Sequence, residues 1–343
     1  MNFFENQRRA RRQTTRLVNL MILSLLALTV LTSLPFVFHG FENYLSGTGS
    51  LLDALMAMAV IASVVSGIVL IGGLLKYHEL RAGGKVVAQK LGGRLISDNG
   101  NTLDEQRLMN IVEEMAIASG TVVPAVYVLP EESINAFAAG FTPQDAVIGV
   151  TQGAISLLSR DELQGVIAHE FSHIYNGDMR LNTQLVAVVY GLLILGIAGA
   201  YILANQLKSN KGEKRDSGIM ILLGVFGLVL CVAGFIGNVF GSLIRAAVSR
   251  QREFLADASA VQFTRNPQSI VGALKKIGAQ GSSISAARAG EYSHLYFSAG
   301  VSNPLSRLFA THPELNERIR RIDPHWDGSF TVRNAAEQAN GQQ

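Results

Sequence analysis

The chain has a single cysteine, Cys231, among its 343 residues. No disulfide can form within it, and a metal site cannot draw on a pair of thiolates. Any protein ligands for a metal must therefore be histidine or carboxylate side chains. Charge is also scarce: Asp, Glu, Lys and Arg make up 16% of the chain, against about 25% in typical soluble proteins. The missing charge is concentrated in a few long segments.

Four segments of at least 22 residues contain no Asp, Glu, Lys or Arg: 17–38, 54–75, 181–207 and 217–244. About 20 apolar residues span the hydrocarbon core of a bilayer, so each segment is long enough to cross a membrane. Four buried core helices of this length would be a poor alternative in a chain of this size. We therefore predict four transmembrane helices.

Basic residues predict the orientation of these spans. Five arginines lie within residues 8–16, ahead of the first span, whereas the loop 39–53 has no Lys or Arg. Positive charge marks the cytoplasmic side, so 1–16 and 76–180 are predicted to be cytoplasmic. The position of the arginines beside a span explains them without a nucleic-acid partner, and none is expected. The basic loop 208–215 conflicts with this orientation and leaves open whether the last two spans cross as simple helices.

Residues 169–173 read H-E-F-S-H, an H-E-x-x-H motif. On a helix, residues four apart share a face, so His169 and His173 can bind one zinc ion, and Glu170 can take a proton from the attacking water. Upstream, S-R-D-E at 159–162 fits a capping box and predicts a helix that begins near residue 160. This context disfavours the alternative of two surface histidines on an ordinary helix.

The remaining sequence predicts a mixed α+β fold that is mostly helical. A second capping box, T-L-D-E at 102–105, predicts another helix start. The polar tail 333–343 is predicted to be disordered. From the apolar patterns we expect strands at 93–96, 125–129 and 146–150, and helices at 85–90, 102–118 and 245–263.

A third metal ligand must lie on the same side of the membrane as the histidine pair. A catalytic zinc takes three protein ligands and keeps one position for water. Two spans after the pair the chain returns to that side, where Glu253 and Asp257 lie four residues apart on a predicted helix. We assign Glu253 as the ligand and Asp257 as the acceptor that orients a ligand histidine through its other ring nitrogen. By spacing alone, ion pairs of Glu253 with Arg250 or Arg252 are equally expected.

The chain resembles the HtpX-type family of membrane zinc metalloproteases, which is related to the prenyl-protein endopeptidases. The resemblance reaches from the first span to about Ile322. It rests on N-A-F-A-A-G at 135–140, on H-E-x-x-H with the following Gly177-Asp178, on S-R-Q-R-E-F-L-A-D at 249–257, and on Thr311-His312-Pro313 with Arg318.

The resemblance implies a zincin-like metalloprotease domain with four transmembrane helices, two of them N-terminal and two inserted between the H-E-x-x-H helix and the third-ligand helix. The predicted parts are a basic N-terminus (1–16), the spans 17–38, 54–75, 181–207 and 217–244, the two parts of the peptidase domain (76–180 and 245–332), and the tail (333–343).

The resemblance also implies roles for single residues. His169, His173 and Glu253 would hold one zinc ion. Glu170 would be the general base. Asn135 and Phe137 would lie on a segment that lines the substrate cleft, and His312 and Arg318 would approach the metal from the opposite side and stabilise an oxyanion. Without the resemblance, His312 would be a helix-start residue and Arg318 a partner of a surface ion pair.

The expected activity is that of a zinc metalloendopeptidase in a bacterial inner membrane. Its substrates would be membrane proteins or misfolded segments, cut on the cytoplasmic side as part of quality control and the stress response. Expected partners are the bilayer and possible further copies of the chain or another quality-control protease. Three alternatives remain: a prenyl-protein-type endopeptidase, whose relatives have more spans; a silent scaffold, disfavoured by the intact Glu170; and a zinc transporter or sensor, disfavoured by the uncharged spans.

Overall fold

A computed structural model describes residues 3–81, 83–97, 102–209, 217–280 and 309–330. The predictions for the loop 211–215 and the tail 333–343 lie outside the described residues. The chain forms two compact units. The sheet unit comprises Met1–Thr14, Arg81–Asn182 and Ala246–Gln343, and the helical unit comprises Thr15–Leu80 and Thr183–Arg245.

The sheet unit is built on four strands: β1 (Arg94–Leu95), β2 (Ala125–Leu129), β3 (Ala136–Ala139) and β4 (Val147–Thr151). Their order is β1-β2-β4-β3, with β2 and β4 parallel and the other pairs antiparallel. Three strands lie where the sequence predicts them. β3 was not predicted as a strand, because its four residues, A-F-A-A, are too few to show an alternating pattern.

The two faces of the sheet are covered differently. Ala136 and Ala138 of β3 belong to the main core, which the helices of the sheet unit share. Phe137 and Ala139 point to the other face and pack with Ala88 of the short helix α3 (Gly84–Lys90). Phe137 fits there because its partner in β4 is Gly149, where an added Cβ would lie 2.2 Å from the Phe137 ring.

Two predicted helices begin at the predicted caps. In α4 (Leu103–Ser119), the Thr102 side chain accepts a hydrogen bond from the backbone N–H of Glu105. In α6 (Arg160–Asn176), both hydrogen bonds of the capping box form between Ser159 and Glu162. α6 ends at Gly177, whose φ of 68° is the left-handed conformation that favours glycine. These local interactions place the H-E-x-x-H motif in the last turns of α6.

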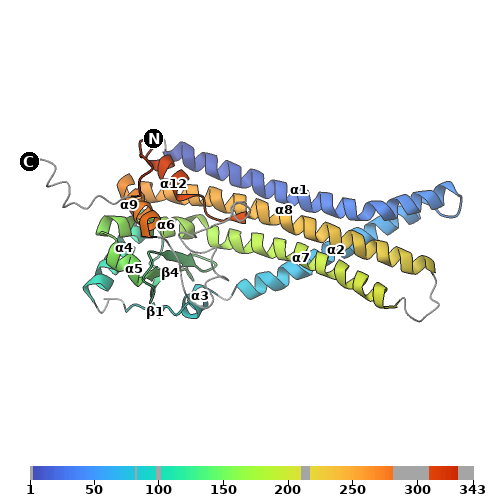
Figure 1. The fold of residues 1–343 in the computed structure, drawn as a ribbon, viewed down its shortest axis with the longest axis horizontal. Helices are drawn as coiled ribbons and strands as arrows, with labels where there is room; N and C mark the ends of the chain where they lie inside the picture. The colour runs from blue at the N-terminus through green and yellow to red at the C-terminus, as the bar shows by residue number, and fades with distance from the viewer. Residues whose placement is uncertain (1–2, 82, 98–101, 210–216, 281–308, 331–343) are drawn as a thin grey trace, which may run out of the picture. The chain divides into compact units, whose positions relative to one another are not determined.

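Three shorter helices among the described residues also belong to the sheet unit: α5 (Gln152–Leu157), α9 (Pro267–Gln280) and α12 (Leu315–Ile322). α9 packs directly on α6 in the main core, and the two are neighbours in Figure 1. The contact depends on Gly165, which leaves room for the backbone of α9. The position of α6, and with it of the motif, is thus set by α9 as well as by the sheet.

Four of the described helices are long and apolar enough to cross a membrane: α1 (Phe3–Leu45), α2 (Leu51–Leu80), α7 (Asp178–Ser209) and α8 (Ser217–Thr264). Within the helical unit α7 and α8 approach closely through small residues, since a Cβ on Gly234 would lie 2.1 Å from the nitrogen of Gly196. Such small-residue contacts are typical of helices packed in lipid.

The predicted fold class, a mostly helical α+β protein with four apolar helices, is confirmed. The predicted span 217–244 and the predicted helix 245–263 are both helical, and they form one continuous 48-residue helix, α8. No proline interrupts this segment, and Arg245, Ala246 and Ala247 favour a helix, so nothing ends it where its composition changes.

Candidate metal centre

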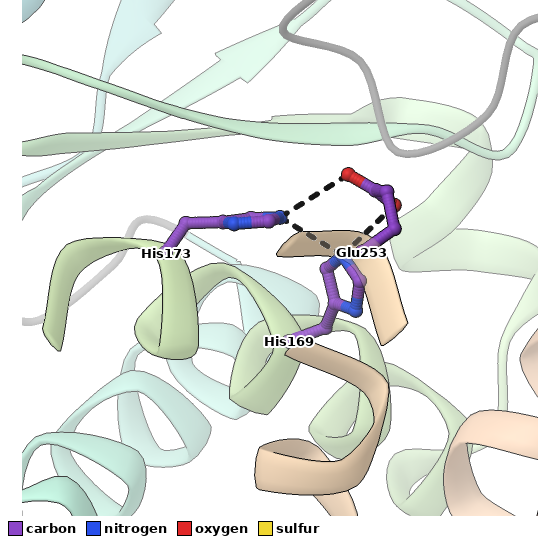
Figure 2. A group of neighbouring side chains, drawn as sticks. All are labelled: His169, His173 and Glu253. Carbon is purple, nitrogen blue, oxygen red and sulfur yellow. Dashed lines mark hydrogen bonds and ion pairs between the residues drawn. The ribbon is translucent and has the colours of Figure 1, made fainter. Parts of the chain in front are cut away.

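Three side chains from two helices converge in the sheet unit. His169 and His173 lie one turn apart on α6, and Glu253 reaches them from α8, as Figure 2 shows. The two histidine Nε2 atoms are 3.1 Å apart. The Glu253 carboxylate lies 3.5 Å from each of them, with Oε2 near His169 and Oε1 near His173. One ligand atom from each residue can thus face a common point.

These separations fit a tetrahedral metal ion. With metal–ligand bonds of about 2.0–2.1 Å, two ligands at a tetrahedral angle are about 3.3 Å apart, close to the 3.1 and 3.5 Å seen here. Two imidazoles and one carboxylate are also a ligand set that catalytic zinc sites use. Among the described residues, Oε1 of the adjacent Glu170 is buried without a hydrogen-bond partner, as expected if it faces a cation or its water.

The Nδ1 atom of His169 is held by a second carboxylate. It lies 2.9 Å from Oδ1 of Asp257, one helical turn beyond Glu253 on α8. Arg318 of α12 donates two hydrogen bonds to Asp257, from Nε to Oδ2 at 2.9 Å and from Nη2 to Oδ1 at 2.7 Å. The carboxylate fixes the ring so that Nε2 faces Glu253. This is the arrangement predicted for Asp257.

The Nδ1 atom of His173 has an equivalent partner that the sequence did not reveal. It lies 2.8 Å from Oδ2 of Asp178, the first residue of α7. Arg252 of α8 donates a hydrogen bond to the other oxygen of Asp178. A signal was present, because a ligand histidine needs an acceptor for its second nitrogen and Asp178 follows His173 closely in the sequence. Whether the Asp178 side chain reaches the His173 ring depends on the turn at Gly177, which spacing alone does not show.

The charges around the histidines favour a cation. Four carboxylates and two guanidinium groups surround the two rings, which leaves an excess of two negative charges. These groups are Glu170, Asp178, Glu253 and Asp257, with Arg252 and Arg318. Burial lowers the pKa of His173, but the hydrogen bonds to Asp178 and Glu253 outweigh it and hold this pKa well above 6.5. The pKa of His169 is raised in the same way by Asp257 and Glu253, against the effect of burial.

Glu170 lies beside the ligand pair with a carboxyl group suited to proton transfer. Burial raises its pKa above the ordinary value, an effect that the neighbouring His173 and His169 oppose. A carboxylate whose pKa is raised is a stronger base near neutral pH than one in water. The geometry therefore provides a base next to the point where the ligand atoms converge.

The structure brings His312 and Arg318 to the same site. His312 lies outside the helices, with Nδ1 3.2 Å from Oε2 of Glu253. Arg318 is fully buried, and its Nη1 lies 3.4 Å from the same oxygen. The alternative of a surface ion pair for Arg318 is therefore wrong.

Asn135 and Phe137 are both buried beside β4. The backbone N–H of Asn135 donates to Oγ1 of Thr151 at 2.9 Å, and its carbonyl accepts from the backbone N–H of Thr151 at 3.1 Å. These bonds anchor the start of β3. Because the Phe137 side chain packs on the α3 face of the sheet, any part that it plays at the cleft is limited to its backbone.

Comparison with known proteins identifies the family of the chain. The model of "Peptidase family M48" matches residues 102–325, well over half of the 343 residues. The chain belongs to peptidase family M48. The matched region contains the three converging residues and both of their orienting carboxylates, so the site lies within the segment that defines the family.

Relatives of this M48 peptidase include several bacterial proteins described as "Protease HtpX homolog". It is 40% identical to the one from Dictyoglomus turgidum over 215 residues, which is 63% of this chain and 68% of the relative. It is 42% identical to that of Thermoanaerobacter pseudethanolicus over 220 residues, 63% of this chain and 70% of the relative. With Streptococcus gordonii the identity is 35% over 247 residues, 69% and 78% of the two chains.

These relatives confirm the predicted resemblance to the HtpX-type family. Together with the four long apolar helices, they identify a bacterial membrane metalloprotease, which acts on peptide substrates and requires a metal. Among solved structures, the crystal structure of S. mikatae Ste24p matches with a TM-score of 0.39 and 15% identity, over 90% of this chain and 66% of that one. This structural likeness is too distant to support an argument.

Proposed function

We propose that this M48 peptidase is a zinc-dependent endopeptidase of the bacterial inner membrane that cuts membrane or misfolded proteins at the cytoplasmic face. One observation carries the proposal: His169, His173 and Glu253 converge at tetrahedral distances beside the buried base Glu170. This combination of ligands and base is what hydrolysis of a peptide bond by an activated water requires.

In this proposal Nε2 of both histidines and the Glu253 carboxylate would hold the zinc ion. When bound, the ion would supply Lewis acidity to the substrate carbonyl and lower the pKa of a water molecule toward about 7. Glu170 takes the proton from the attacking water and later returns it to the leaving amine. Asp257 and Arg318 keep His169 in the orientation that faces the ion.

We assign the oxyanion-stabilising role to His312 in preference to Arg318. His312 reaches the site with an imidazole whose Nδ1 lies 3.2 Å from Oε2 of Glu253. Arg318 is committed to Asp257 through two hydrogen bonds and also contacts Glu253. A donor at the position of His312 would stabilise negative charge that develops on the carbonyl oxygen. Arg318 would then act through Asp257 and Glu253.

An extended substrate fits this site because β3 is at one edge of the sheet formed by the described residues and packs against α6. A peptide that runs along such an edge gains backbone hydrogen bonds that do not depend on its sequence. This mode of binding suits an enzyme that cuts unfolded segments. Asn135 contributes by anchoring the start of the strand on Thr151.

Contacts within the sheet unit support a cytoplasmic site. Gln7 donates a hydrogen bond to Gln262 and Arg11 donates one to Asn176 at the end of α6. The N-terminal turns of α1 thus belong to the same compact unit as the metal centre and share its side of the membrane. The arginines within residues 8–16 favour the cytoplasm as that side by the positive-inside rule.

Substitution of the base tests the catalytic proposal. The full chain and Glu170→Gln are purified in detergent, their bound zinc is measured, and cleavage of an unfolded protein such as casein is followed. We expect one zinc per chain in both and cleavage by the wild type alone. Equal cleavage by both proteins would remove Glu170 from the mechanism, and zinc binding without cleavage by either would favour a silent scaffold.

A second experiment tests the orientation. A compartment-sensitive reporter fused at the N-terminus and another fused at Lys211 should report opposite sides of the membrane if α7 and α8 form a simple spanning hairpin. A cytoplasmic signal at Lys211 would contradict the hairpin. A periplasmic signal at the N-terminus would contradict the cytoplasmic site.

A further inference from the structure

We propose that Asp178 and Arg252 form a positioning pair that orients His173 for zinc and ties its orientation to the helices α7 and α8. The inference rests on the proposed function, because it assumes that His173 is a zinc ligand. Both residues lie in segments that carry the family resemblance, but the resemblance assigns neither of them a role.

The contacts form a continuous path from α8 to the ligand. Oδ2 of Asp178 lies 2.8 Å from Nδ1 of His173, so Nδ1 carries the proton and Nε2 keeps its lone pair for the metal. The other oxygen of Asp178 accepts from Nε of Arg252. Nη2 of Arg252 also donates to the backbone carbonyl of Asn176 at 3.2 Å. One guanidinium therefore holds the last residue of α6 and the first residue of α7.

The break between α6 and α7 makes this path possible. In a continuous helix, a side chain five residues after His173 would point away from it. Gly177, with its φ of 68°, ends α6 and turns the chain so that Asp178 points back to the ring. Arg252 bridges that break. Because it directly precedes Glu253 on α8, the same helix turn supplies the third ligand and the anchor of the second.

His173 needs such a pair more than His169 does. The side chain of His169 is fully buried, whereas 16% of the His173 side chain is exposed. Packing alone therefore restrains His169 better. The Asp257–Arg318 pair is the buried counterpart on His169, and its guanidinium comes from α12. In the pair on His173 the guanidinium comes from α8 and the carboxylate is the first residue of α7.

The test measures zinc affinity in the full-length protein in detergent, by competition with a chelator of known affinity. For Asp178→Asn we expect a loss of about 10- to 100-fold, the usual effect of removing the orienting partner of a ligand histidine. For Arg252→Gln we expect a smaller loss. In the double variant Arg252→Gln should add almost nothing, because the arginine acts through Asp178. The absorption spectrum of the Co²⁺-substituted protein should change in each variant.

Matched variants separate positioning from charge and from folding. Arg180→Gln removes one positive charge two residues from Asp178, from an arginine that stacks on Phe141 instead, and should keep the zinc affinity of the wild type. Arg252→Lys keeps the charge but loses the forked geometry, so it should recover part of the loss caused by Arg252→Gln. Thermal unfolding of each zinc-free variant checks its fold, and if Asp178→Asn does not fold, the two Arg252 variants decide the question.

Three results would overturn the inference: an Asp178→Asn variant with the affinity and Co²⁺ spectrum of the wild type, Arg252 variants without effect, or fully additive losses in the double variant. If the wild type itself binds no zinc, the proposed function fails instead. The two failures are therefore distinguishable.

Discussion

Gly165 of α6 and Ile270 of α9 are so close that a Cβ added to the glycine would lie 2.6 Å from the Ile270 nitrogen. A side chain at this position would push α9 away from the helix that carries both metal-binding histidines. The neighbour is backbone, which cannot move aside as the end of a flexible side chain can.

Gly165→Ala should therefore destabilise the fold by about 1–3 kcal/mol, the usual cost of overpacking, and should lower zinc content. Thermal unfolding and metal analysis measure both effects. Gly224→Ala on α8 is the control, because nothing lies within 4 Å of a Cβ at that position and alanine favours a helix more than glycine does. An equal loss of stability in both variants would mean that close packing at Gly165 is not the cause.

Stability should respond to pH in opposite directions with and without zinc. In the zinc-free protein, the folded-state pKa of His173 is raised well above 6.5. The stabilisation that this provides is complete below pH 6.5 and is lost as the pH rises through the folded-state pKa. Zinc requires unprotonated imidazoles, so its affinity should increase over the same range.

Unfolding curves from pH 6 to pH 9, recorded with excess zinc and with a chelator, test this. The midpoint should fall with pH in the chelator series and rise in the zinc series. Parallel curves in the two series would show that zinc does not displace protons from His169 and His173.

Phe137→Ala should act on stability and not on substrate binding. The ring is buried over Gly149, and its removal leaves a cavity that costs about 3–5 kcal/mol. Phe137→Leu fills most of the space and should cost less. At a temperature where the variants are folded, KM for a peptide substrate should stay near the wild-type value. A large increase in KM with unchanged stability would restore the predicted contact of this side chain with substrate.

Asp145 holds the turn between β3 and β4. Its carboxylate accepts hydrogen bonds from the backbone N–H groups of Phe141 and Thr142 and from the Thr142 hydroxyl. Partial burial opposes ionisation, but these bonds outweigh it and lower the pKa of Asp145. The stabilisation is therefore present above pH 3.8 and is lost as the pH falls through the folded-state pKa.

Asp145→Ala should loosen β3, the edge strand on which we expect the substrate to pair. KM should rise more than kcat falls, because the turn shapes the strand on which we expect the substrate to pair. Asp145→Asn keeps one acceptor oxygen and should lie between the wild type and Asp145→Ala. A variant that loses kcat with unchanged KM would contradict pairing on β3.

The sequence predicted those features that depend on local contacts. The starts of α4 and α6 follow from capping residues three positions apart, and the histidine pair follows from the period of a helix. Membrane topology limited the third ligand to Glu253 or Asp257, and the resemblance to the HtpX-type family favoured Glu253.

Other features depend on contacts between distant segments and could not be read from the sequence. Arg252 and Asp178 are 74 residues apart, and neither has a spacing that indicates the other. On spacing alone, two roles of Glu253 were equally expected. One was an ion pair with Arg250 or Arg252, and the other was a carboxylate that faces the metal. In the structure Arg252 pairs with Asp178, and Arg250 donates to the carbonyl of Ala310 at 2.8 Å, so Glu253 faces the histidines.

The continuity of α8 makes the third ligand sensitive to helical phase. Each residue of an α-helix adds about 100° of rotation and 1.5 Å of length. One extra residue between Glu253 and Asp257 would turn one carboxylate about a quarter of the way around the axis relative to the other, so that both could no longer face His169, while every side chain of the site stayed in the sequence. The length of an uninterrupted helix is thus as strictly constrained as the identity of the residue that it carries.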